Sequence, residues 1–157
     1  MSALFDMKKI KIQTNNKKPI EQWSLPNNRY SSIDTSKFNT GILTGRVNNI
    51  IVLDIDYKDN GIDEFNKYIS IYGKPNTFTQ KTTNNGFHYY FSFEHSKIDI
   101  EYIIQNCLVN KSKYRGVGID IRSNGGYVVS YPSIINNSQY TILNDIPIIE
   151  MPETLVK

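Results

Sequence analysis

Residues 49–56 read Asn-Ile-Ile-Val-Leu-Asp-Ile-Asp, an apolar run rich in β-branched side chains that ends in two aspartates. Such a run is typical of a buried β-strand. Because the side chains of a strand alternate between its two faces, Asp54 and Asp56 share one face and Ile55 points to the other. Charged residues are almost never fully buried without a partner. This strand therefore requires one covered apolar face and another face that tolerates two carboxylates.

A helix is predicted to follow this strand. Asp59 or Asn60 can cap its first turn, and Gly73 is a suitable residue to end it. Asp63 and Lys67 are spaced for an i,i+4 ion pair. The apolar stripe expected to face the core is spaced three, four and three residues apart. It consists of Ile62, Phe65, Ile69 and Tyr72.

The rest of the chain alternates between strand and helix patterns. Residues 77–81 and 87–93 are predicted strands joined by a turn containing Asn-Gly, a strong hairpin signal. Residues 118–122 and 127–131 are also predicted strands. A second helix is predicted between these two pairs of strands. Its apolar stripe consists of Ile100, Ile103, Ile104, Cys107 and Leu108.

From residue 50 to residue 122 the predicted order is β-α-β-β-α-β. This is the split βαβ arrangement of ferredoxin-like and RNA-recognition-motif-like sheets. We therefore predict an α+β fold, with a mixed sheet, helices on one face, and the other face open for chemistry. The residues expected under the helices are Ile51, Leu53, Ile55, Ile119 and Ile121. Those expected on the open face are Asp54, Asp56, His88, Asp120 and Arg122.

The length of 157 residues is typical of one domain, which we assign to residues 1–157. Residues 1–40 are expected to pack on the core as an N-terminal segment, and residues 142–157 to form a loose tail that leads into a further domain. No run approaches the roughly 20 apolar residues that cross a membrane, so no membrane partner is expected. The one cysteine cannot form an intramolecular disulfide, which favours a reducing, intracellular compartment.

Three aspartates are candidates for a metal site. Asp54 and Asp56 repel each other unless a cation lies between them. Asp120, on another predicted strand, can add a third carboxylate. Magnesium prefers such oxygen ligands and usually combines one or two carboxylates with substrate phosphates. The simpler interpretation is that the aspartates end their strands and face solvent.

Other candidates are cationic. His88, Arg122 and Lys81 are predicted to bind a nucleotide, since a guanidinium matches phosphate geometry. The alternatives are that His88 is an ordinary surface histidine, that Arg122 only neutralises the carboxylates in an ion pair, and that Lys81 only marks a strand end. The basic loop with Lys111, Lys113 and Arg115 is a candidate for nucleic-acid contact, although a charge run is usually a solvated face. The net charge of +3 permits nucleic-acid binding without requiring it.

Several motifs occur in an order that resembles a known family. They are residues 41–45 (Gly-Ile-Leu-Thr-Gly), 50–56, 82–91 (Thr-Thr-Asn-Asn-Gly-Phe-His-Tyr-Tyr-Phe), 118–129 and 131–133 (Tyr-Pro-Ser). Together they resemble the bifunctional DNA primase/polymerase domain of the archaeo-eukaryotic primase superfamily, found in plasmids, phages and large DNA viruses and often fused to a helicase. The resemblance extends from Lys17 to about Pro152, and Pro19 and Trp23 fit the family's N-terminal segment.

The resemblance implies a function. Asp54 and Asp56 match the family's acidic pair, Gly86-Phe87-His88 its small-x-His motif, and Ile119-Asp120 its third motif. It implies that the aspartates bind Mg²⁺ or Mn²⁺ and that His88 contacts the incoming nucleotide. The expected reaction is transfer from an NTP or dNTP to a 3′-hydroxyl on a primer paired with a single-stranded DNA template, with two metal ions about 3.5–4 Å apart. A replicative helicase, fused or separate, is the expected partner.

Two other functions fit the same residues. A non-catalytic nucleic-acid-binding module would place stacking aromatics on the sheet, and Tyr90 is suitably positioned for this in the sequence. A metal-dependent nuclease also uses clustered carboxylates. A test of whether nucleic-acid binding depends on metal distinguishes the non-catalytic module from the polymerase. Loss of the input strand, in place of its extension, identifies a nuclease.

Overall fold

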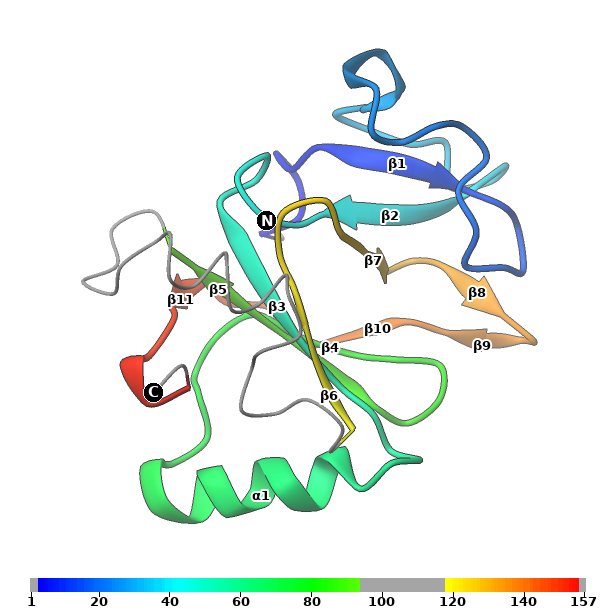
Figure 1. Cartoon of the computed structure of the whole chain (residues 1–157). Helices are drawn as coiled ribbons and strands as arrows, with labels where there is room; N and C mark the ends of the chain where they lie inside the picture. Colours follow the sequence, from blue (N-terminus) through cyan, green and yellow to red (C-terminus); the bar gives the residue numbers. More distant parts are fainter. Residues whose placement is uncertain (1–2, 94–117, 156–157) are drawn as a thin grey trace.

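The structure, a computed structural model, describes residues 3–93 and 118–155 (Figure 1). The predicted second helix and the basic residues Lys111, Lys113 and Arg115 lie outside this range. Across the described parts of the chain, no helix has the length and apolar character needed to span a membrane. The main elements are β1 (Lys9–Ile12), β2 (Asn39–Leu43), β3 (Ile50–Ile55), α1 (Gly61–Tyr72), β4 (Thr79–Lys81), β5 (Phe87–Ser92), β6 (Ile119–Arg122), β7 (Tyr127–Ser130) and β10 (Thr141–Asn144). Shorter elements are η1 (Pro26–Asn28), β8 (Ile134–Ile135), β9 (Ser138–Gln139), β11 (Ile149–Glu150) and η2 (Glu153–Leu155).

The main sheet has the strand order β10-β4-β5-β3-β6, with all these neighbours antiparallel and β11 parallel to the end of β5. The prediction of an α+β fold is confirmed. The four strands of the expected split unit lie in the order β4-β5-β3-β6. Because the second helix of that unit lies outside the described residues, the recognition-motif-like arrangement as a whole stays a prediction.

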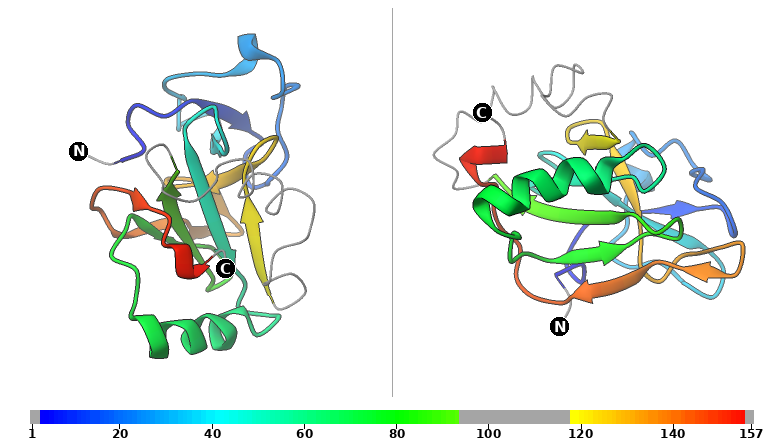
Figure 2. Two further views of the ribbon diagram at one scale, coloured as in Figure 1. Left: turned by 60° about the vertical axis from the view of Figure 1, so that its left-hand side comes forward. Right: turned by 90° about the horizontal axis from the view of Figure 1, so that it is seen from below.

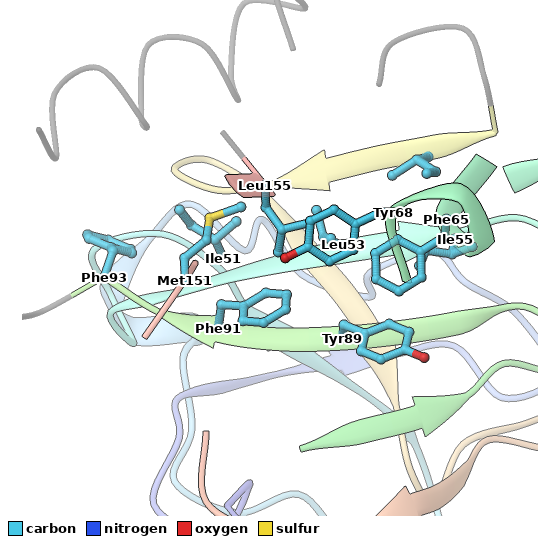
Figure 3. Packing of buried hydrophobic residues seen from close by; sticks show 11 residues of the cluster. Ile51, Leu53, Ile55, Phe65, Tyr68, Tyr89, Phe91, Phe93, Met151 and Leu155 are labelled. Carbon is cyan, nitrogen blue, oxygen red and sulfur yellow. The ribbon is translucent and has the colours of Figure 1, made fainter. Parts of the chain in front are cut away.

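Helix α1 runs along one face of the main sheet (Figure 2). Alternate side chains of β3 and β5 pack there with the helix and with the C-terminal residues (Figure 3). The apolar stripe differs from the prediction at its end: Tyr68 is buried, whereas Tyr72 is 57% exposed. The expected pair of Asp63 with Lys67 is also wrong, since Lys67 donates to Glu64 over 2.7 Å. The core of this face comprises Ile51, Leu53, Ile55, Phe65, Tyr68, Tyr89, Phe91, Phe93, Ile119, Met151 and Leu155.

The opposite face of the main sheet is not open along its whole length, which corrects the prediction. A second antiparallel sheet, with the order β1-β2-β7, covers the part of that face where β3 begins (Figure 1). Burying this apolar half is favourable at about 25 cal/mol per Å² of surface removed from water. The packed residues are Leu4, Ile42, Ile50, Val52, Phe78, Tyr90 and Val128.

A buried polar network joins the two sheets. The side-chain amide of Gln80 in β4 donates to the Tyr90 hydroxyl over 2.7 Å, and its carbonyl oxygen accepts from the Tyr131 backbone N–H over 2.7 Å. Gln80 and Tyr90 are fully buried. Buried polar groups are stabilising only when their hydrogen bonds are made, so this network holds the sheets in one relative position.

Both ends of the described chain belong to the core. The region from residue 142, expected to be a loose tail, contains the end of β10, which pairs with β4, and β11, which pairs with β5. Met151 and Leu155 are then buried under α1. In the N-terminal segment, β1 pairs with β2. The expectation of a loose tail is thus wrong for the residues described.

Candidate active site

The register of the main sheet gathers three of the predicted site residues around one position. Asp54 in β3 lies directly opposite His88 in β5 on one side and directly opposite Asp120 in β6 on the other. Directly opposite residues of antiparallel strands project from the same face, with Cβ atoms about 4.5–5.5 Å apart. The three side chains therefore leave the sheet together, beyond the area that the second sheet covers.

A cavity of about 390 Å³ lies over this part of the face, between the two sheets. Its charged and imidazole groups come from Lys17, Asp54, Asp56, His88 and Arg122. Its aromatic groups come from Trp23, Tyr127 and Tyr140, and the Gly125-Gly126 turn forms part of the wall. A concave site with convergent charged groups beside aromatic surface is the usual form of a small-molecule pocket.

His88 and Asp54 form a close pair on the cavity floor. His88 Nε2 lies 3.3 Å from Asp54 Oδ1, with the two side chains 5% and 30% exposed. Burial raises the pKa of Asp54, but the hydrogen bond and charge of His88, with the charges of Arg122 and Lys17, outweigh burial and lower this pKa overall. The Asp54 carboxylate is therefore held ionised on the cavity floor.

The second imidazole nitrogen of His88 lacks a partner. Within the described residues, the buried Nδ1 atom has no hydrogen bond. An unsatisfied buried polar group costs about 1–3 kcal/mol, and in native proteins it commonly marks a place where a ligand, ion or water binds. The Nδ1 atom is thus a buried polar group for which the described residues supply no partner.

The packing around Gly86 requires a residue without a side chain two positions before His88. A Cβ atom at Gly86 would lie 2.4 Å from the carbonyl oxygen of Ile55. The absence of a side chain lets the start of β5 lie against the end of β3, with His88 opposite Asp54. Gly86 thus serves close packing that sets the position of the imidazole.

Asp56 and Arg122 line the cavity, whereas Asp120 lies beside it, next to Arg122. The Arg122 guanidinium lies 3.5 Å from the Asp120 carboxylate, and both side chains are exposed, by 46% and 71%. Asp56 lines the main cavity and also a neighbouring one of about 390 Å³, which Asp120 lines too. Asp56 accepts a hydrogen bond from the Lys58 backbone N–H over 2.9 Å. Within residues 3–93 and 118–155, no group of three or more carboxylate, histidine or cysteine side chains is arranged to hold a metal ion.

Lys81 is separated from the other predicted nucleotide-binding residues. Its register partner is Phe87, whereas the partner of the preceding Gln80 is His88. Because side chains alternate, Lys81 projects from the face that carries α1, away from His88. The structure brings together Asp54, Asp56, His88, Asp120 and Arg122 but not Lys81.

Some residues of the cavity were not predicted to belong to the site. Lys17 and Trp23 come from the N-terminal segment, and Tyr140 lies just before β10. Burial, partly offset by a hydrogen bond from Thr83 and reinforced by the charge of Asp54, raises the pKa of Tyr140 to about 12, so its hydroxyl stays protonated at neutral pH. The family resemblance, which begins at Lys17 and includes Trp23, was a sequence signal that pointed to two of these residues.

Comparison with protein families identifies the family of this chain. The chain matches the family model described as "Bifunctional DNA primase/polymerase, N-terminal" over residues 7–154, nearly its whole length. No curated protein shows significant sequence similarity to it. The matched region contains every strand of both sheets and all the cavity residues described above. The chain therefore belongs to the bifunctional DNA primase/polymerase (Prim-Pol) family.

Proposed function

We propose that this chain catalyses template-dependent nucleotidyl transfer in DNA replication, with the reaction taking place in the cavity between the two sheets. The 3′-oxygen of a primer bonds to the α-phosphorus of a nucleoside triphosphate, and the bond from that phosphorus to the β-phosphate breaks. Pyrophosphate leaves, and the proton of the 3′-hydroxyl is released to solvent. The single observation that carries the proposal is Asp54 in register with both His88 and Asp120 at the cavity floor.

The three carboxylates offer the kind of ligand that a divalent ion takes, although among the described residues they do not form a ready-made metal site. Asp54, Asp56 and Asp120 offer only oxygen ligands, which Mg²⁺ and Mn²⁺ prefer, and Asp54 and Asp120 are like charges on directly opposite positions. When bound, the metal supplies charge stabilisation for the attacking and leaving oxygens. Because Asp120 is paired with Arg122 over 3.5 Å, it has to exchange this partner to act as a ligand.

The remaining cavity groups suit a nucleotide. His88 lines the cavity with its Nε2 atom beside Asp54, and is proposed to contact the nucleotide there. Arg122, released from Asp120, provides a planar guanidinium for phosphate oxygens. These two residues bind and orient the triphosphate, so that its α-phosphorus lies near the carboxylates. Holding reactants in a near-attack geometry contributes several kcal/mol to catalysis in general.

A DNA template and a helicase are the further partners that we propose. The basic residues Lys111, Lys113 and Arg115 are candidates for binding the backbone of the single-stranded DNA template, because lysine and arginine make most phosphate contacts. A replicative helicase, fused or separate, is proposed to provide the unwound template.

Primer extension tests the proposal. A labelled primer on a single-stranded template is incubated with dNTPs and Mg²⁺ or Mn²⁺, using the wild type and an Asp54→Ala/Asp56→Ala variant. Asp145→Ala is a matched control, since it removes an exposed carboxylate that does not line the cavity. We expect metal-dependent elongation by the wild type and the control, and none by the double variant.

Other outcomes would identify other functions. Shortening of the input strand would indicate a nuclease, and metal-independent DNA binding without extension would indicate a non-catalytic module. Tyr90, the residue expected to stack on bases in such a module, is fully buried between the sheets, so that expectation is wrong. Elongation by the double variant would overturn the assignment of the carboxylates.

A further inference from the structure

A short loop of the N-terminal segment, residues 13–18, reaches the cavity from the second sheet. It is closed by a hydrogen bond from the Gln13 backbone N–H to the Lys18 carbonyl oxygen over 2.9 Å. Asn15 adopts a left-handed conformation with φ of 55°, and its side chain accepts a hydrogen bond from the Asn136 backbone N–H. The loop is thus a tight turn whose tip is tied to a distant part of the chain.

Two further hydrogen bonds fix the side of the loop nearest the cavity. The hydroxyl of Tyr127 in β7 donates to the Lys17 carbonyl oxygen over 2.9 Å. The side-chain amide of Asn39 in β2 donates to the Asn16 carbonyl oxygen over 3.2 Å. The backbone of Lys17 is therefore held by two strands of the second sheet, β2 and β7, at the edge of the cavity that its side chain lines.

The ammonium group of Lys17 differs from that of other lysines in the segment. Lys9 Nζ donates to three backbone carbonyl oxygens, and Lys11 Nζ lies 3.9 Å from Glu21. Lys17 lines the cavity, yet no hydrogen bond or ion pair within residues 3–93 and 118–155 engages its Nζ atom. A cation positioned at a ligand cavity without a protein partner is available to a ligand.

The charge balance of the cavity indicates what kind of ligand this cation serves. Besides Lys17, the only permanent cation in the described cavity lining is Arg122, which is paired with Asp120. A lysine ammonium binds phosphate as a point charge, with hydrogen bonds that are charge-assisted.

We propose that Lys17 binds the triphosphate of the incoming nucleotide, held over the cavity by the Tyr127 hydroxyl. This inference rests on the proposed function, since it assigns a further substrate contact in the same cavity. In this proposal Lys17 contacts the nucleotide and not the DNA backbone.

Calorimetric titration tests the role of Lys17. The ligands are inorganic tripolyphosphate, a dNTP and the corresponding deoxynucleoside, each in the presence of Mg²⁺. Lys17→Ala is compared with the wild type, with Lys17→Arg, which keeps the charge, and with Lys18→Ala, which removes the adjacent exposed cation outside the cavity lining. Urea unfolding of each variant checks that the fold is retained, and a fluorescence-polarisation assay measures binding of single-stranded DNA.

We expect Lys17→Ala to weaken binding of tripolyphosphate and of the dNTP roughly tenfold, as for loss of one charge-assisted hydrogen bond. Deoxynucleoside binding is expected to be unchanged, Lys17→Arg to retain most of the affinity, and Lys18→Ala to resemble the wild type. Equal affinity of the Lys17→Ala and Lys18→Ala variants for tripolyphosphate would overturn the inference while leaving the proposed function intact. Loss of DNA binding alone would also overturn it, in favour of a template contact. Failure of the wild type to bind any nucleotide would instead overturn the proposed function, and this inference with it.

Discussion

The two faces of the strand pair β3 and β5 are built from alternate residues of the same strands, yet they differ in the polarity of the side chains that they carry. The face under α1 is apolar from one end to the other. The opposite face is apolar only where the second sheet covers it, at Ile50, Val52 and Tyr90. Beyond that cover the same face carries Asp54 and His88.

The difference shows where this fold is stable and where it is strained. Most of the described core side chains of the face under α1 are apolar, and the Tyr68 hydroxyl is hydrogen-bonded to Thr154, so the contribution of this face follows mainly from buried area and packing. The cavity face holds two carboxylates on opposite positions and a buried imidazole nitrogen that, among the described residues, has no partner. Such features are unfavourable for folding, and natural proteins concentrate them at functional sites.

The largest expected effect on stability comes from the face under α1. Phe91 is fully buried there, and Phe91→Ala is expected to lower the free energy of unfolding by about 3–5 kcal/mol, because it leaves a cavity in the core. Urea unfolding followed by circular dichroism measures this loss. Nucleotide affinity per folded molecule is expected to change little. A loss below about 1 kcal/mol would show that the packing of this face is looser than its burial indicates.

Gly86→Ala is expected to affect both faces. The new Cβ atom would lie 2.4 Å from the Ile55 carbonyl oxygen, so β5 has to move away from β3. Overpacking of this kind typically costs about 1–3 kcal/mol, and the movement also displaces His88. Unfolding and nucleotide titration together measure the two effects. Wild-type affinity in a destabilised variant would separate the packing role of Gly86 from the position of His88.

Asp120→Asn is expected to separate activity from stability. The substitution removes the like charge opposite Asp54 and an exposed ion pair with Arg122, so the free energy of unfolding is expected to stay within about 1 kcal/mol of the wild type. Primer extension is expected to fall by roughly 100-fold or more, as for loss of an electrostatic contact to the reacting groups. Full activity in this variant would remove Asp120 from the proposed site.

The sequence predicted one face of the molecule better than the other. Alternation of apolar residues in the strand that carries Asp54, and a 3.6-residue period after it, was sufficient to place α1 over Leu53 and Ile55. These signals are local, and each has a defined geometric meaning. The end of the stripe was missed: Tyr68, three residues after Phe65, lies on the same helix face. Leu155 and its neighbours in the C-terminal region, which are distant in sequence, pack in the same core as Tyr68.

The cavity depends on contacts that are distant in sequence. Lys17 reaches it because the hydroxyl of Tyr127 holds the loop across a sequence separation of 110 residues. The strand β1 has only four residues, too few for a clear periodic signal, although it carries this loop. Likewise Lys81 was assigned by its charge, whereas its face is decided by pairing with Phe87. Residue type identified the chemistry of the site, and tertiary pairing decided which residues take part.

The smallest expected effect is on the pH dependence of the unfolding free energy. It tests whether the cavity face stabilises the charge of Asp54. The pKa of Asp54 is lowered in the folded protein, because His88, Arg122 and Lys17 together outweigh the effect of burial. A carboxylate with a lowered pKa contributes stability above its unfolded pKa, about 3.9, and this contribution is lost as pH falls through the folded value. Asp54→Asn removes the contribution, so the difference in unfolding free energy between wild type and variant is expected to be largest above pH of about 4 and to shrink at lower pH. Urea unfolding of both proteins across that range measures the difference. A gap that is independent of pH would mean that Asp54 acts through packing, like the residues on the face under α1, and that the cations of the cavity are kept for a ligand alone.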